Sequence, residues 1–178
     1  MSESSLSRSA DIIEKITVSV GRLSSAAYPL LVVVVIVNVI FRYVFSRGMI
    51  ELEEVQWHLY SLGFLLGYAW TYAENEHVRV DVFYHQFSER TKALIEFLGC
   101  LFLLLPFSLS IPYFSLDFVL NSWSLGEGSD NPSGLPARYI IKAVMTVGLS
   151  FLCLQCLATL ARAFLKLRTV SSSGKETD

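Results

Sequence analysis

The chain has 178 residues, of which 53% are hydrophobic and 17% are charged. Its mean hydropathy of +0.49 is higher than that of ordinary soluble domains, whose charged share is about 25%. A net charge of −2 offers no basic surface for nucleic acid, and the apolar content excludes intrinsic disorder.

Charged residues are absent from four long windows, at 23–41, 55–73, 97–116 and 143–161. About 20 helical residues, rising roughly 1.5 Å each, cross a hydrocarbon core of roughly 30 Å. A charge at the centre of such a helix costs about 2.5–3.5 kcal/mol on insertion, which explains the exclusion. The sequence therefore predicts an all-α integral membrane protein, a single domain over residues 1–178 with four transmembrane helices at about 23–44, 53–73, 93–117 and 138–162.

Two amphipathic segments flank the predicted spans. The first is the segment 1–22, whose apolar stripe of Ile12, Ile13, Ile16 and Val20 continues to Leu23 at the start of the first span. A second stripe, formed by Val80, Phe83, Tyr84 and Phe87, ends at Ser88, which we expect to cap the next helix. Both stripes are typical of interfacial helices that lie on a membrane, and both could instead rest on a partner subunit.

The N-terminus does not resemble a cleavable signal, because residues 1–11 are polar and the first apolar span is too long. The alternative is a signal peptide followed by three spans. Ten Lys and Arg residues lie in the two tails and the second loop, against four in the first and third loops. The positive-inside rule therefore predicts that both termini, including the 163–178 tail, are cytoplasmic.

Glycine, proline and polar residues within the predicted spans indicate how the helices pack. Gly63 and Gly67 form a G-x-x-x-G face that packs either within the chain or against a partner. Pro106 and Pro112 predict a kink or local unwinding in the third span. Gln155 is most simply a hydrogen bond between helices.

No acidic residue or lysine lies in the middle of a predicted span, although a self-sufficient ion-coupled transporter usually needs such a group. Cys100, Cys153 and Cys156 are best interpreted as buried small side chains, because a zinc site needs more ligands. His58 is the one histidine within a span, which disfavours bis-histidine haem. We therefore expect no catalytic residue, no metal site and no cofactor.

Four motifs together resemble a known family. They are F-R-Y-V-F at 41–45, E-L-E-E at 51–54, E-H-V-R-V-D-V at 76–82 and G-L-P-A-R-Y at 134–139. In this order and at span ends, they resemble the small membrane subunit, DctQ type, of tripartite ATP-independent periplasmic (TRAP) transporters, over roughly residues 32–164. Met49 and Ile50 stand where such proteins often carry a tryptophan.

The resemblance implies a division of labour. A large membrane subunit carries the substrate and sodium sites, and a soluble periplasmic protein captures the substrate, usually an organic acid. The small subunit braces the large one, lies in a bacterial or archaeal cytoplasmic membrane among its lipids, and is not an enzyme.

The residues that the motifs and the span ends single out are expected to act at partner interfaces or in structure. Glu53 and Glu54 either cap the second span or meet a partner. The inner-loop motif either fixes its loop through ion pairs or contacts the large subunit or anionic lipid. The loop at 121–137, with Trp123, is either an interfacial loop or a docking surface for an external protein. The full set comprises Arg42, Glu53, Glu54, Trp57, Gly63, Gly67, Glu76, His77, Arg79, Asp81, Trp123 and Arg138.

Three other functions compete with this interpretation. A stand-alone four-helix transporter is disfavoured by the missing mid-span carboxylate. A membrane anchor of a redox enzyme is disfavoured by the single intramembrane histidine. A thiol oxidoreductase is disfavoured by the positions of the cysteines.

Overall fold

A computed structural model of the chain describes residues 3–74 and 87–173. The described residues form helices joined by turns and loops and contain no strand. The helices, in chain order, are α1 (Glu3–Ser24), α2 (Ala27–Tyr43), α3 (Ile50–Ala73), α5 (Glu89–Gly99), the π-helix η1 (Cys100–Leu104), α6 (Leu105–Ser124) and α7 (Tyr139–Ser173).

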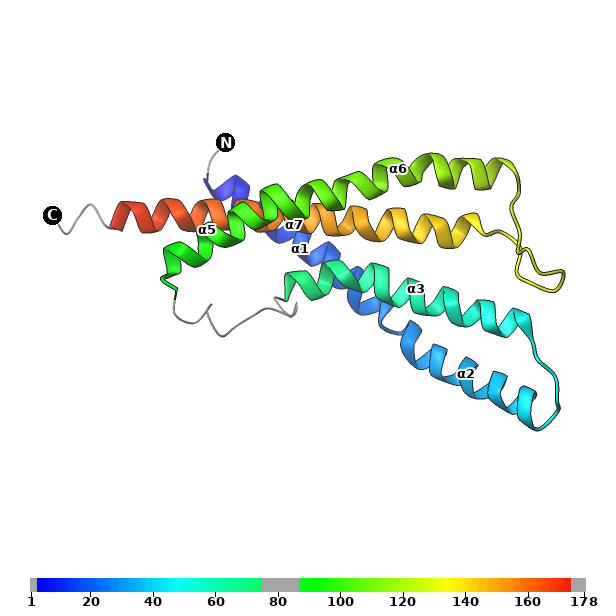
Figure 1. Ribbon diagram of the computed structural model, residues 1–178. Helices are drawn as coiled ribbons and strands as arrows, with labels where there is room; N and C mark the ends of the chain where they lie inside the picture. The colour runs from blue at the N-terminus through cyan, green and yellow to red at the C-terminus, as the bar shows by residue number, and fades with distance from the viewer. Residues whose placement is uncertain (1–2, 75–86, 174–178) are drawn as a thin grey trace.

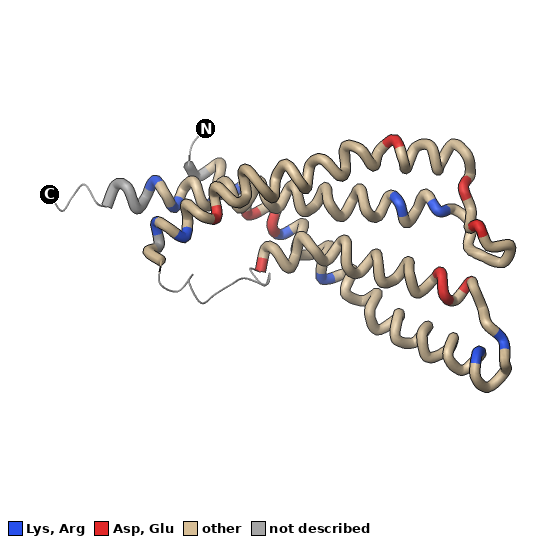
Figure 2. Tube along the Cα trace, in the orientation of Figure 1, with Lys and Arg blue, Asp and Glu red and all other residues tan. Residues whose placement is uncertain are grey.

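The helices run up and down along one long axis (Figure 1). The connections α2–α3 and α6–α7 lie at one end, called here the loop end, and the first and last described residues lie toward the other, the terminus end. Acidic and basic residues lie near the loop end and in the half of the molecule toward the terminus end, and the stretches of α2, α3, α6 and α7 between these two groups are free of them (Figure 2). This distribution matches the four charge-free windows of the sequence.

Three described stretches are long and apolar enough to cross a membrane: Ser5–Tyr43, Arg90–Ser124 and Tyr139–Arg168. The all-helical membrane class is thereby confirmed. Helix α3 is 24 residues long but is not among the three. Three glutamates open it, and aromatic and glycine residues dilute its apolar run. The fourth span therefore stays a prediction.

A turn separates the helix of the amphipathic segment predicted at 1–22 from the helix of the first predicted span, although no turn was predicted there from the sequence. A turn at Ser25 and Ala26 separates α1 from α2. Pro29 lies in the first turn of α2, where its missing N–H is tolerated, but it cannot continue a helix that arrives from α1. The hydroxyl of Ser25 also donates to the Arg22 carbonyl at 2.7 Å, which competes with the helical ladder.

The predicted disturbance of the third span is confirmed, and it takes the form of the π-helix η1. The N–H of Leu105 donates to the carbonyl of Cys100, five residues back. Pro106 follows immediately, and it has no N–H and would clash with the carbonyl four residues earlier. The wider turn before Pro106 absorbs this conflict. Ser88 caps α5 as predicted, because its side chain accepts from the N–H of Thr91.

Helix α1 packs against α3 and α7 through small residues rather than through its apolar stripe. Ala10, Thr17, Gly21 and Ser24 are buried, whereas Ile12 and other stripe residues stay exposed. A Cβ on Gly21 would lie 2.2 Å from the Cβ of Trp70, so only glycine permits this approach. Thr17 donates to the Gln155 side-chain oxygen at 2.7 Å, which confirms the predicted role of Gln155.

Helices α3 and α7 form the core around Ala69, Leu149 and Leu152. Their closest approach is at Gly148, where an added Cβ would lie 2.6 Å from the carbonyl oxygen of Leu65. Close backbone contact of this kind replaces the hydrophobic drive that is missing between helices in lipid.

The sequence predicted that all three cysteines are buried small side chains, but in the structure two of them are bonded to each other. Cys100 and Cys156 pair as a disulfide between η1 and α7, with their Cα atoms 6.2 Å apart, and Cys153 is free. The sequence contains no sign of this pairing, because the two residues are 56 positions apart and meet only once η1 packs on α7.

We expect Gly148→Ala to lower the melting temperature of the purified chain in detergent. The new methyl group would meet the backbone of Leu65, which cannot rotate away, and overpacking of this kind costs about 1–3 kcal/mol. Gly99→Ala is the matched control, because nothing lies within 4 Å of its added Cβ. Equal melting temperatures for the two variants would contradict the close contact.

Candidate functional site

Glu54, in the second turn of α3, joins sequence motifs that lie far apart in the chain. Its Oε2 accepts from the N–H of Leu135 at 2.6 Å, and its Oε1 accepts from the hydroxyl of Ser129. The Arg138 guanidinium lies 4.0 Å from the same carboxylate. The E-L-E-E and G-L-P-A-R-Y motifs therefore meet at the loop end.

Gly134 makes this meeting possible. A Cβ at this position would lie 2.2 Å from the Ser129 hydroxyl and 2.8 Å from the Glu54 carboxylate. The loop closes on itself as well, since the N–H of Ser129 donates to the carbonyl of Leu135 at 3.0 Å. The result is a compact connection built around one carboxylate of a neighbouring helix.

A second set of charges joins the same loop to α7. Lys142 pairs with Glu127, and its ammonium lies 3.8 Å from the centre of the Phe118 ring on α6. The ammonium lowers the pKa of the Glu127 carboxyl below its usual value. The Arg138 guanidinium pairs with Asp130 at 3.3 Å. The backbone N–H of Arg138 donates to the backbone carbonyl of Glu127 at 2.8 Å.

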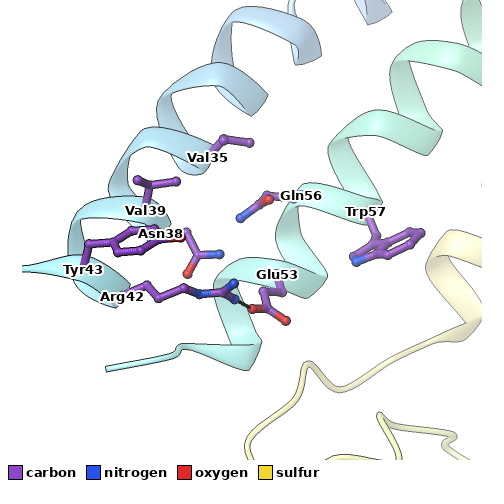
Figure 3. Close-up of a pocket in the computed structure, with 8 residues that line it drawn as sticks. All are labelled: Val35, Asn38, Val39, Arg42, Tyr43, Glu53, Gln56 and Trp57. Carbon is purple, nitrogen blue, oxygen red and sulfur yellow. Dashed lines mark hydrogen bonds and ion pairs between the residues drawn. The ribbon is translucent and has the colours of Figure 1, made fainter. Parts of the chain in front are cut away.

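Glu53 faces the other way. It pairs with Arg42, in the last turn of α2 (Figure 3). The F-R-Y-V-F motif is thus tied to the same acidic pair that holds the α6–α7 loop. Neither glutamate provides the N-cap of α3, because that position belongs to Met49 and has no side-chain hydrogen bond.

A cavity of about 430 Å³ lies beneath the Arg42–Glu53 pair, between α2 and α3. Asn38 and Gln56 point into the space between the two helices, as Figure 3 shows. The Asn38 Oδ1 and the Gln56 Nε2 are buried without a hydrogen-bond partner. A second cavity of about 490 Å³ lies between α3 and α7, and its lining includes Glu54, Trp57, His58 and Arg138.

The predicted glycine face packs within the chain. A Cβ on Gly63 would lie 3.0 Å from the ring of Tyr28 on α2, and Gly67 faces the hydroxyl of Ser24. The two tryptophans among the predicted site residues are exposed: 71% of the Trp57 surface and 63% of the Trp123 surface are accessible to solvent. The Trp123 ring packs edge-on against Tyr139, 4.5 Å between centres.

The other predicted site residues, Glu76, His77, Arg79 and Asp81, lie outside the described residues. Within the described parts of the chain, no group of three His, Cys, Asp or Glu side chains could hold a metal ion. The loop-end cluster, as it is called here, comprises Ser129 and the charged side chains Arg42, Glu53, Glu54, Glu127, Asp130, Arg138 and Lys142. The charged members pair with one another, so the cluster holds the helices and the α6–α7 loop together.

Sequence reasoning missed several members of the cluster. Ser129 and the Glu127–Lys142 pair belong to it, but a serine or a glutamate in a glycine-rich loop carries no distinguishing signal. The sequence did identify the G-L-P-A-R-Y motif. Its contact with Glu54 became visible only in the structure.

We expect Glu54→Gln to loosen the α6–α7 loop. A carboxamide has only one acceptor oxygen, and it would turn its NH₂ toward a donor that Glu54 now accepts from, either Leu135 or Ser129. Faster amide hydrogen exchange at Leu135 and faster proteolysis within 126–137 would show the loosening. Glu51→Gln, one turn earlier on α3, is the control and should leave both rates unchanged. Equal protection in the two variants would contradict this role of Glu54.

Comparisons with known proteins agree with the motifs. Residues 31–166 match the family described as tripartite ATP-independent periplasmic transporters, DctQ component. A Haemophilus influenzae protein named as a TRAP transporter small permease is 29% identical over 106 residues. This match covers 60% of the chain and 66% of that relative, slightly less than two thirds of its length. No solved structure matches the chain. With the helical membrane fold and the converging motifs, these matches show that the chain belongs to the DctQ family of TRAP transporter small subunits, which confirms the resemblance.

Proposed function

We propose that this chain braces the large membrane subunit of a TRAP transporter during sodium-coupled, binding-protein-dependent uptake of an organic acid. One observation carries the proposal. The four membrane windows contain no Asp, Glu, Lys or Arg, while the charges at the loop end largely pair with each other. Such a chain is equipped to hold a shape and not to carry a coupled ion.

The transport steps belong to the other components. Sodium and substrate sites would lie in the large subunit, and the family resemblance supports this assignment. The exposed loop-end residues Trp123, Leu125 and Asp130 are available to a periplasmic binding protein. The exposed apolar faces of α2 and α6 are available to lipid or to the large subunit.

Helix α3 is proposed as the fourth span, with both termini on the cytoplasmic side of a bacterial or archaeal inner membrane. Its 24 residues correspond to roughly 36 Å of helix, enough to cross a hydrocarbon core of roughly 30 Å. It also runs alongside α7 from the loop end toward the terminus end (Figure 1). Its packing on α7 would cover part of a surface that is less apolar than that of the other spans.

Reporter fusions at Gly48 and Gly128 test this topology. With four spans, both positions lie on the outside, and a phosphatase active only in the periplasm reports at each. With three spans that omit α3, the two positions lie on opposite sides of the membrane. A fusion at Lys175 gives a third reading, because it should be inactive with four spans and active with three. Opposite readings at Gly48 and Gly128 would remove the fourth span.

Co-expression with the large subunit of the same system tests the bracing role. The tagged chain should retain the large subunit through purification, and cells lacking the chain should lose most sodium-dependent uptake. The chain reconstituted alone should transport nothing. Full uptake by the large subunit and binding protein without this chain would contradict the proposal.

A further inference from the structure

The cavity between α2 and α3 contains polar groups that the chain itself leaves unsatisfied. Asn38 is only 7% exposed, yet its Oδ1 has no hydrogen-bond partner. On the facing helix, the Nε2 of Gln56 is also buried without one. Both side chains point into the same space (Figure 3). A buried polar atom without a partner costs free energy, and acyl chains offer no partner for either amide.

The occupant must both donate and accept. Asn38 presents a free acceptor, and Gln56 presents a free donor. A single hydroxyl or carboxamide satisfies both requirements. The cavity, at about 430 Å³, has room for such a side chain together with part of the helix that carries it.

The charges at the mouth argue against an ionic occupant. Arg42 and Glu53 pair with each other, so the opening has no free cation to hold a phosphate and no free anion to hold an amine. Val35 and Val39 form an apolar wall on the α2 side, which suits a membrane helix. A charge pair with no net charge, an apolar wall on the α2 side and two unsatisfied amides therefore match a polar side chain on an apolar helix better than a lipid headgroup.

We propose that the cleft between α2 and α3 receives a transmembrane helix of the large subunit, which inserts a serine, threonine, asparagine or glutamine side chain between Asn38 and Gln56. The inference rests on the proposed function, because it takes the large subunit as the partner. It assigns the contact to one cleft, which the bracing role by itself does not. Helix α2 packs chiefly on α3, so its remaining surface is open to the partner.

Photocrosslinking locates the contact. A benzophenone amino acid at Val39, which lines the cleft, should give an adduct with the co-expressed large subunit. The same probe at Val33 is the control, since Val33 is 54% exposed on α2 but does not line the cleft. An adduct at Val39 with a second copy of this chain, with lipid only, or with no protein would overturn the proposal.

The double variant Asn38→Leu, Gln56→Leu tests the two amides. The large subunit should bind more weakly by about threefold to thirtyfold for each hydrogen bond lost between helices in a membrane. The melting temperature of the isolated chain should stay level or rise, because two unsatisfied polar groups are removed. Asn121→Leu, at the exposed end of α6, is the control and should change neither quantity.

The outcomes separate this inference from the proposed function. If the wild-type chain retains the large subunit and the double variant binds it equally well, the cleft assignment is overturned and the proposed function stands. A fall in the melting temperature of the isolated double variant would show that the amides already serve an internal contact, and would overturn it too. Failure of the wild-type chain to retain the large subunit would contradict both.

Discussion

The loop end depends on two adjacent carboxylates that face opposite ways. Glu53 pairs with Arg42 on α2, while Glu54 accepts from Ser129 and Leu135 in the α6–α7 loop. Neighbouring residues on a helix are about 100° apart, so one turn of α3 can face two sides of the bundle. Helix α3 is therefore the shared support through which the two helical hairpins of the chain keep a fixed relation.

Away from the loop end, small residues hold the helices in place by allowing close contact between them. Gly21 admits Trp70, Gly63 admits Tyr28, and Gly148 lies against the backbone of Leu65. Lipid supplies little hydrophobic drive for helix association, so close packing and hydrogen bonds between helices must supply it. Thr17 with Gln155 and Ser115 with Thr146, both at 2.7 Å, provide those bonds on the two flanks of α7.

Much of this fold could be predicted, because a membrane imposes its constraint on every residue of a span. Charge exclusion alone located four helices, and Pro106 marked η1. The predicted boundary between the 1–22 segment and the first span lies close to the turn at Ser25 and Ala26, but the turn itself was missed because Pro29 is uncharged and lies within an otherwise uniform apolar window. The site was less accessible. The motifs were visible, but Glu54 was expected to cap α3 or meet a partner, and its contacts with Ser129 and Leu135 depend on how a loop some 80 residues away folds back.

The α2–α3 hairpin leaves two buried side-chain amides without partners, and this feature bears on the role of the chain. Helices α6 and α7 share the Ser115–Thr146 bond, and their loop is closed by Glu54, Arg138 and Lys142. Helix α2 is tied at its end by Arg42, but beneath that pair two amides face a cavity without partners. A chain that folded only for itself would gain by replacing both amides with apolar side chains. Their presence in the α2–α3 pair, beside the core that α3 forms with α7, agrees with the proposed contact with another subunit.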